Sequence, residues 1–209
     1  MSATCPNLQK SIGWCQGKPE YPGIRGRVYF ASKGNIVKFP ALTRDALKRA
    51  TGATLTGNFE LAADEVWHYI DINVEKSQLT SEAQGESPSQ TQLNKLTLVH
   101  NGVGEDASAA AAYMNNNDNV YVVQDMAGRY RVVGNERWQS VTTVAQDSGQ
   151  GTNPASTTIE VQCTDEIAAP FYTGTLETEE GTLDCSTGEI DSDSAVNNDS
   201  VSGSDSGAG

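Results

Sequence analysis

The sequence predicts a mainly β fold, a β-sandwich or barrel with one flanking α-helix. Short runs of β-branched and aromatic residues recur between clusters of Gly, Pro and Asn, a pattern typical of antiparallel sheets. One segment, residues 104–119, carries strong helix signals, and both ends of the chain lack periodicity. We therefore expect an extended arm at 1–23, a single β-domain at 24–180, and a disordered acidic Ser/Asp/Gly-rich tail at 181–209.

The first half of the domain reads as strands joined by turns. Residues 24–40 resemble a β-hairpin with turn chemistry at Ser32–Asn35, and Pro40 ends the return strand. Residues 43–50 suit a short helix with Thr43 as its N-cap. Residues 54–61 and 66–74 read as strands. In the second of these, alternation places His68 on an aliphatic face with Val66, Ile70, Ile72 and Val74, opposite Trp67, Tyr69, Asp71 and Asn73.

The second half contains a polar stretch at 78–92 that suits either a solvated loop or a long hairpin tip. Strand runs follow at Leu93–His100, Val120–Gln124, Arg129–Val133, Trp138–Ala145, Thr157–Cys163 and Pro170–Leu176, and the second and third of these form a predicted hairpin. The helix is expected to begin after Gly104, with Glu105 and Asp106 complementing its dipole and five alanines favouring it. We expect the Asn run from Asn115 to stop it by left-handed capping.

Charge is sorted by position along the chain. Residues 1–50 carry nine Lys/Arg and two acids, 51–163 carry five Lys/Arg and fourteen acids, and 164–209 carry eleven acids and no base. A basic front and an acidic back predict head-to-tail attraction between copies, which builds rings or stacks. The net charge of −13 argues against a nucleic-acid binder, although the basic front could still contact a phosphate backbone locally. The tail itself has two readings, a solubilising fringe or a contact with the basic arm of another copy.

The chain shows neither a signal peptide nor a membrane-length apolar run, so we expect synthesis in a host cytoplasm. Four cysteines fall into two pairs, Cys5/Cys15 and Cys163/Cys185. The spacing disfavours zinc and leaves free thiols or a disulfide within either pair as the open readings.

No catalytic set emerges from the sequence. His68 reads as a half-buried ring, and His100 lies near Asp106 without a spaced Ser or Cys nucleophile. The carboxylate pairs, Asp64/Glu65, Glu105/Asp106, Asp165/Glu166 and Glu179/Glu180, are adjacent rather than facing, which is typical of solvated surface. Asp184–Asp193 departs from the EF-hand pattern and could give only a weak cation site, and Gly102-x-Gly104 lacks the rest of a phosphate loop. We expect no enzyme activity and no catalytic, cofactor-binding or metal-binding residue.

The order of elements nevertheless resembles one known family. The elements in question are a strand ending Phe39-Pro40, TGNFEL at Thr56–Leu61, a Trp-bearing strand from Trp67 to Asp71, SEAQGES at Ser81–Ser87, the Ala-rich helix ending in an Asn run, and DMAGRYRVVGN at Asp125–Asn135. Together they resemble major tail tube proteins of tailed bacteriophages and related prophage virion proteins, over residues 25–175. The four cysteines and the acidic tail depart from that family.

The resemblance implies a β-sandwich subunit of a tail tube. Such subunits form hexameric rings, join inner strands into a continuous barrel, and stack into a tube with an acidic lumen through which DNA passes. The stretch 78–92 would correspond to the loop that clasps a neighbour, and residues 1–23 to an arm. The expected location is the virion tail, with other copies and other tail proteins as partners and no membrane. The alternative is a capsid-decoration or receptor- or glycan-binding β-sandwich module.

Overall fold

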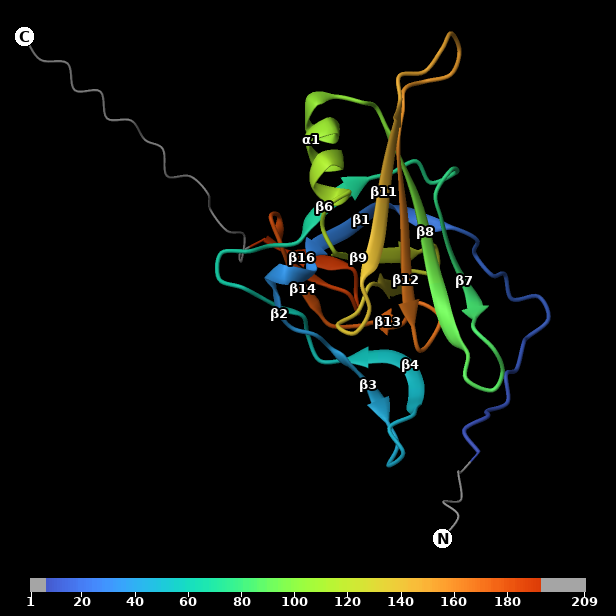
Figure 1. Ribbon diagram of the computed structural model, residues 1–209. Coiled ribbons are helices and arrows are strands. Elements are labelled where there is room, and N and C mark those ends of the chain that lie inside the picture. The colour runs from blue at the N-terminus through green and yellow to red at the C-terminus, as the bar shows by residue number, and fades with distance from the viewer. Residues whose placement is uncertain (1–6, 193–209) are drawn as a thin grey trace, which may run out of the picture.

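The fold is described for residues 7–192 of a computed structural model (Figure 1). Cys5 and residues 193–209 of the predicted tail lie outside the described residues. The described part is mainly β with one α-helix, α1 (Glu105–Met114). The strands are β1 (Ile24–Ser32), β2 (Ile36–Lys38), β3 (Ala41–Arg44), β4 (Ala50–Thr56), β5 (Glu60–Leu61), β6 (His68–Asp71), β7 (Gln78–Gln84), β8 (Thr91–Asn101), β9 (Asn119–Asp125), β10 (Tyr130–Val133), β11 (Ser140–Asp147), β12 (Ser156–Asp165), β13 (Phe171–Tyr172), β14 (Thr175–Thr178), β15 (Gly181–Asp184) and β16 (Glu189–Asp191).

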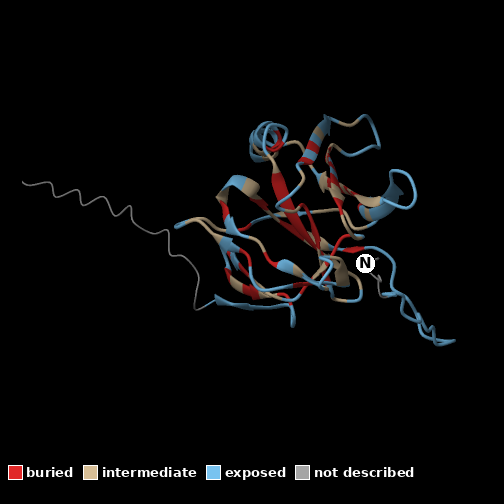
Figure 2. Ribbon diagram, turned by 60° about the horizontal axis from the view of Figure 1, so that its bottom comes forward, coloured by how far each residue is buried: buried red, intermediate tan, exposed pale blue. Residues whose placement is uncertain are grey.

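The central layer is a seven-stranded sheet in the order β3-β4-β13-β10-β9-β1-β6, in which only the β4–β13 pair is parallel. Its middle strands are buried on both faces, because successive side chains of a strand point to opposite sides. In β9, Val120 and Val122 enter one core cluster, whereas Tyr121 and Val123 enter another. Figure 2 shows this buried centre in red.

A four-stranded sheet, β11-β12-β8-β7, covers one face of the central sheet. Its inward residues Leu96, Leu98, Ile159 and Val161 pack against Val28 and the β9 side chains, which makes the predicted sandwich. On the opposite face lies a small sheet, β14-β15-β16, which contributes Leu176 and Leu183 to the other cluster. The β-sandwich with one flanking helix is therefore confirmed.

The folded part extends beyond residue 180, where the sequence places the end of the domain. Leu183 and Cys185 are 1% and 3% exposed, because β15 pairs with β14 and seats both side chains in the core. The acidic composition of this segment favours disorder, but Leu183 buries enough apolar surface to keep its strand in the fold. Of the predicted tail, residues 181–192 are thus described as two further strands and their turns.

The predicted hairpin at 24–40 is wrong in its pairing. The turn exists as a short 3-10 helix at Lys33–Asn35, but β1 pairs with β6 and β9, whereas β2 pairs with β5. The short helix at 43–50 is also wrong, since this segment is the β3–β4 hairpin. The Asp45 carboxylate accepts hydrogen bonds from the backbone N–H groups of Leu47 and Arg49, both 2.9 Å, and this local turn outcompetes a helix.

Most local expectations in the second half hold, but the predicted strand Pro170–Leu176 is divided between β13 and β14, which belong to different sheets. The stretch 78–92 is a hairpin, β7–β8, so its long-hairpin reading is the correct one. The β9–β10 hairpin and the β11 and β12 strands form as predicted. Helix α1 ends as expected at the Asn run, but not by left-handed capping, because Asn115 has φ −63°. Instead the Asn116 side chain donates to the Ala112 carbonyl at 2.9 Å, and the Val144 N–H donates to the Asn115 side chain at 2.7 Å.

Candidate assembly interface

The four-stranded sheet ends in β7 on one side and in β11 on the other, and neither strand has a further strand paired to it within the described chain. At the β11 edge, the Ser140 and Val144 N–H groups donate to the side chains of Asp118 and Asn115 at 2.9 and 2.7 Å, so a second copy would have to displace these two contacts. The three pairings of the sheet run without a register shift, and all are antiparallel. Neither edge strand contains Pro, Lys or Arg, the residues that usually protect an edge from pairing with another chain. Val141 on β11 is 59% exposed, which leaves a β-branched side chain uncovered at the edge.

The two edges of the central sheet differ from these. At one end β3 spans only Ala41–Arg44 and has a register shift against β4. At the other end β6 spans only His68–Asp71, and the Trp67 N–H just before it donates to the Glu177 carbonyl at 2.7 Å. Short, irregular edges disfavour pairing with a second chain, so β7 and β11 are the candidates for assembly.

The two central rows of the outer face of the four-stranded sheet carry few charges. Register defines these rows as Val141-Gln162-Lys95-Thr80 and Thr143-Glu160-Thr97-Gln78. Lys95 forms an ion pair with Glu82 on the neighbouring strand, which leaves Glu160 as the charge without a basic residue opposite it in these rows. The face is a hydroxyl and amide surface of weakly negative character.

The basic front of the chain is largely neutralised within its own fold. Of the nine Lys/Arg in residues 1–50, five form ion pairs in the described part of the chain: Arg27, Lys33, Lys38, Arg44 and Arg49. Four of these five pair with acids beyond residue 50. Most of these basic side chains therefore pair with acidic side chains of distant segments in the same molecule. Less positive charge remains unpaired to attract the acidic residues of a second copy.

One ion-pair cluster fixes the β3–β4 hairpin to the sandwich. Glu166, just after β12, accepts two hydrogen bonds from Arg44 on β3 at 2.8 and 2.9 Å and one from Arg137 at 3.0 Å. The hydrogen bonds from Arg44 and the two positive charges lower the pKa of Glu166, against the opposing effect of burial. The neighbouring Asp165 is 5% exposed, and burial raises its pKa.

This cluster predicts a stability loss in acid. A carboxyl whose pKa is lower in the folded state stabilises the fold above its unfolded pKa, about 4.3, and that contribution disappears as pH falls through the folded value. Glu166→Gln is therefore expected to lower the thermal midpoint at pH 7 and to reduce its decrease between about pH 5 and pH 3. Thermal unfolding monitored by circular dichroism at several pH values measures this. Glu75→Gln, at an exposed position, provides the control, and an unchanged pH profile in Glu166→Gln would contradict the assignment.

The sequence-predicted chemical groups do not converge on one site. His68 is exposed rather than half-buried, and its Nδ1 lies 2.7 Å from Glu179, because the buried side chain of this segment is its neighbour Trp67. His100 Nδ1 lies 2.7 Å from the Asp71 carbonyl oxygen. In residues 7–192, no group of three or more His, Cys, Asp and Glu could hold a metal ion.

The other acidic pairs have structural surroundings. Asp64 and Glu105 with Asp106 are exposed, and Glu65 accepts a hydrogen bond from the Asn35 side chain at 2.7 Å. Glu179 and Glu180 contact His68 and Arg27. In the segment Asp184–Asp193, Asp184 accepts hydrogen bonds from the N–H and hydroxyl of Ser186, both 2.7 Å, and Asp193 lies outside the described residues. Gly102 and Gly104 join β8 to α1, and Gly102 N–H donates to Ala155 O at 3.0 Å.

Of the two readings that the sequence leaves open for Cys163 and Cys185, free thiols are the correct one, since neither forms a disulfide and they belong to different core clusters. Burial raises the pKa of Cys163 to about 12 and also raises the pKa of Cys185, so both thiols resist ionisation. Cys15 is free and exposed on the arm, while its possible partner Cys5 is outside the described residues.

The tryptophans form no shared aromatic platform. Trp14 is 70% exposed on the arm, Trp67 is 1% exposed in the core, and Trp138 lines a groove with Phe39 and Phe59. A glycan-binding module of the kind raised by the sequence would need aromatic faces side by side on one surface. No observation on these residues favours that alternative.

No family model, curated protein or solved structure matches the chain. Within residues 7–192, no helix is both long enough and apolar enough to cross a membrane. The sequence predicts a loop or a hairpin where β7 lies and a strand where β11 lies, but it does not show that either strand is at an edge of a sheet. Their lack of Pro and basic residues is the signal that could have marked them.

Proposed function

We propose that this protein is the structural subunit of a self-assembling tube, of the kind that forms the tail of tailed bacteriophages. The observation that carries this proposal is the pair of regular edge strands β7 and β11 on one four-stranded sheet, neither of which contains Pro, Lys or Arg. In the proposed ring, β11 of one copy pairs with β7 of the next, and repetition of this contact closes the sheets into one barrel.

The strand directions favour this closure. All three pairings in the sheet are antiparallel, so β11 and β7, at its two edges, run in opposite directions. Because each copy supplies an even number of strands, a ring made by simple rotation keeps every neighbouring pair antiparallel, including the pairs between copies. A sheet with an odd number of strands would place parallel strands at each junction.

The proposed ring order is six, as the family resemblance implies. Six copies would give a barrel of about 24 strands spaced about 4.8 Å apart, with a backbone diameter of roughly 37 Å before strand tilt widens it. Side chains narrow this opening, which remains wide enough for a DNA duplex. The lumen would be lined by the hydroxyl and amide face, with Glu160 repeated in each copy as its negative charge. The basic residue in the two rows, Lys95, is paired with Glu82, so such a surface offers phosphate little to bind tightly.

The test of this proposal is substitution of the β11 edge. Val141→Glu with Thr143→Glu places two carboxylates at an exposed edge, where the next copy would present Glu82 on the same face. Like charges on opposing strands destabilise pairing, so we expect the concentration needed for assembly to rise about tenfold or more. Negative-stain microscopy and sedimentation velocity measure rings, tubes and monomers directly.

The matched control adds the same charge to an interior strand of the same face. Thr158→Glu with Gln162→Glu on β12 changes net charge equally but leaves both edges intact. We expect this variant to form rings at the wild-type concentration. Equal loss of assembly in both variants would reject edge pairing, and a wild-type chain that stays monomeric at high concentration would reject the tube itself.

A further inference from the structure

The described part of the N-terminal arm exposes apolar side chains that its own domain leaves uncovered. Every residue from 7 to 23 is exposed, with Ile12 at 98% and Trp14 at 70% (Figure 2). Leu8, Ile12 and Trp14 lie at alternate positions with Lys10, so an extended chain carries them on one side. The intervening residues, Asn7, Gln9, Ser11 and Gly13, are polar or small. The segment 7–14 therefore has the pattern of a strand that buries one face.

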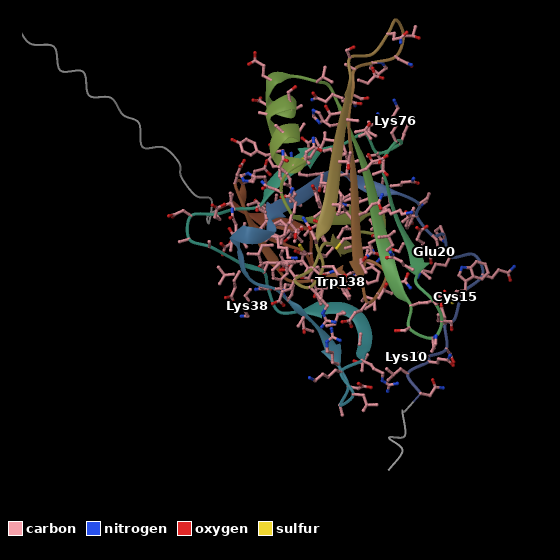
Figure 3. The ribbon with its side chains drawn as sticks, viewed as in Figure 1. Lys10, Cys15, Glu20, Lys38, Lys76 and Trp138 are labelled. Atoms are coloured by element: carbon pink, nitrogen blue, oxygen red, sulfur yellow. The ribbon has the colours of Figure 1, made fainter. Side chains whose placement is uncertain are left out.

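The arm runs toward the end of the molecule that bears the β3–β4 hairpin. Lys10 Nζ donates to the Thr51 carbonyl of β4 at 3.5 Å, and Figure 3 shows Lys10 at this end, with Cys15 and Glu20 farther along the side of the sandwich. Helix α1 and the β11–β12 turn occupy the opposite end (Figure 1). In a head-to-tail stack, the arm of one copy thus faces the α1 end of the copy in the next ring.

At that opposite end, an apolar groove of about 250 Å³ opens between α1 and β6. Its walls come from Ala107, Ala110 and Met114 of α1 and from Ile70 of β6, with Val144 and Ile159 beneath. A second groove of about 310 Å³, which also includes Ala110 and Met114, lies alongside. The space exists because the alanines of α1 are too short to fill it, and only Ala111 and Met114 of the helix are buried.

We infer that this α1–β6 groove receives the arm segment 7–14 of a second copy, from the adjacent ring. The inference rests on the proposed tube and names its axial contact. Ile12 and Trp14 supply apolar side chains for the apolar part of the groove, which consists of Ala, Ile, Met and Val side chains. Charge also matches, because the exposed Asp106 lines the groove while Lys10 lies on the same side of the arm as the apolar residues. Asp71, which also lines the groove, is already paired with Arg27.

The first test separates stacking from ring formation. Ile12→Ser with Trp14→Ser is expected to leave rings intact but to shorten or abolish tubes by negative-stain microscopy, with at least a tenfold drop in the tube fraction. Val37→Ser, which removes another exposed apolar side chain at 72% exposure, serves as the control and should stack normally. Normal tubes in the doubly substituted arm would overturn the inference while leaving the proposed ring standing. If the unmodified protein forms no rings, both this inference and the proposed tube are overturned.

The second test identifies the receiving surface and the donor copy. Trp14 is replaced by the photoreactive analogue p-benzoylphenylalanine in a mixture of ¹⁵N-labelled and unlabelled chains, which is irradiated after assembly. We expect cross-links to peptides containing Ala107–Met114, with mixed-isotope pairs showing that the two segments come from different copies. Cross-links confined to one isotope would show that the arm folds onto its own groove, and cross-links to other segments would place the receiving surface elsewhere. Either result overturns the inference.

Discussion

Replacing Trp67 by alanine is expected to lower the free energy of unfolding by about 3–5 kcal/mol, the usual range for a large aromatic residue in a packed core. Trp67 is 1% exposed and packs edge-on against Phe59, with ring centroids 5.1 Å apart. Phe59 in turn contacts Phe39 at 5.7 Å and Tyr172 at 5.1 Å. The substitution removes one of the three rings packed around Phe59, and the remaining rings belong to different segments that cannot all close the cavity.

Urea unfolding monitored by tryptophan fluorescence and circular dichroism measures the loss. Trp138→Ala is the comparison. Because Trp138 is only partly buried, its replacement should lower the free energy of unfolding clearly less. A loss below about 1.5 kcal/mol in Trp67→Ala, or equal losses in the two variants, would show that the aromatic group does not hold the small sheet β14-β15-β16 against the central sheet.

Trp67 also shows where sequence periodicity fails. Alternation over residues 66–74 assigns His68 to the aliphatic side and Trp67 to the mixed side, and the strand was expected to bury the aliphatic side. Only His68–Asp71 forms a strand, and it lies at a sheet edge with both faces partly covered. Alternation reports the two faces of a strand, but which face is buried more deeply depends on the layers packed against each, here the β14–β16 sheet on the Trp67 side.

Elements that depend on neighbouring residues could be predicted. The β9–β10 hairpin and α1 form within short segments, where turn residues and helix propensity act directly. Pairing between distant segments could not be predicted. The residues of β1 read equally well as half of a local hairpin, yet β1 pairs with β6 and β9 because those contacts place Val28 and Tyr29 in two separate cores.

The same limit applies to the candidate assembly interface. The residues of β7 and β11 show in the sequence only that they can form strands, whereas their place at the two edges follows from the order of the whole sheet. The separation of basic and acidic residues is visible in the sequence, but only the fold shows that many of these charges pair within one molecule. Arg27 contacts Asp71 and Glu180, so a basic front and an acidic back meet inside one molecule. Strand pairing and apolar contacts, rather than net attraction, thus carry the proposed assembly.

The second large effect is expected at Gly181, the first residue of β15. Its φ is +126°, a conformation that other residues adopt only with strain, and an added Cβ would lie 2.2 Å from the carbonyl oxygen of Asp191 in β16. Because that oxygen belongs to the backbone, the clash cannot be relieved by rotating a side chain. Gly181→Ala is therefore expected to cost about 2–3 kcal/mol and to separate β16 from β15.

Hydrogen exchange followed by mass spectrometry locates this effect. Peptides covering β15 and β16 should lose protection in Gly181→Ala, while those covering β8 and β12 keep theirs, since the four-stranded sheet makes no pairing with β16. Gly52→Ala is the matched control, because a Cβ there meets no atom within 4 Å and its φ lies outside the strained range. A lack of protection at β16 in both the unmodified chain and Gly181→Ala would mean that the acidic segment after residue 180 does not belong to the fold. The domain would then end where composition alone places it, and the burial of Leu183 would need another explanation.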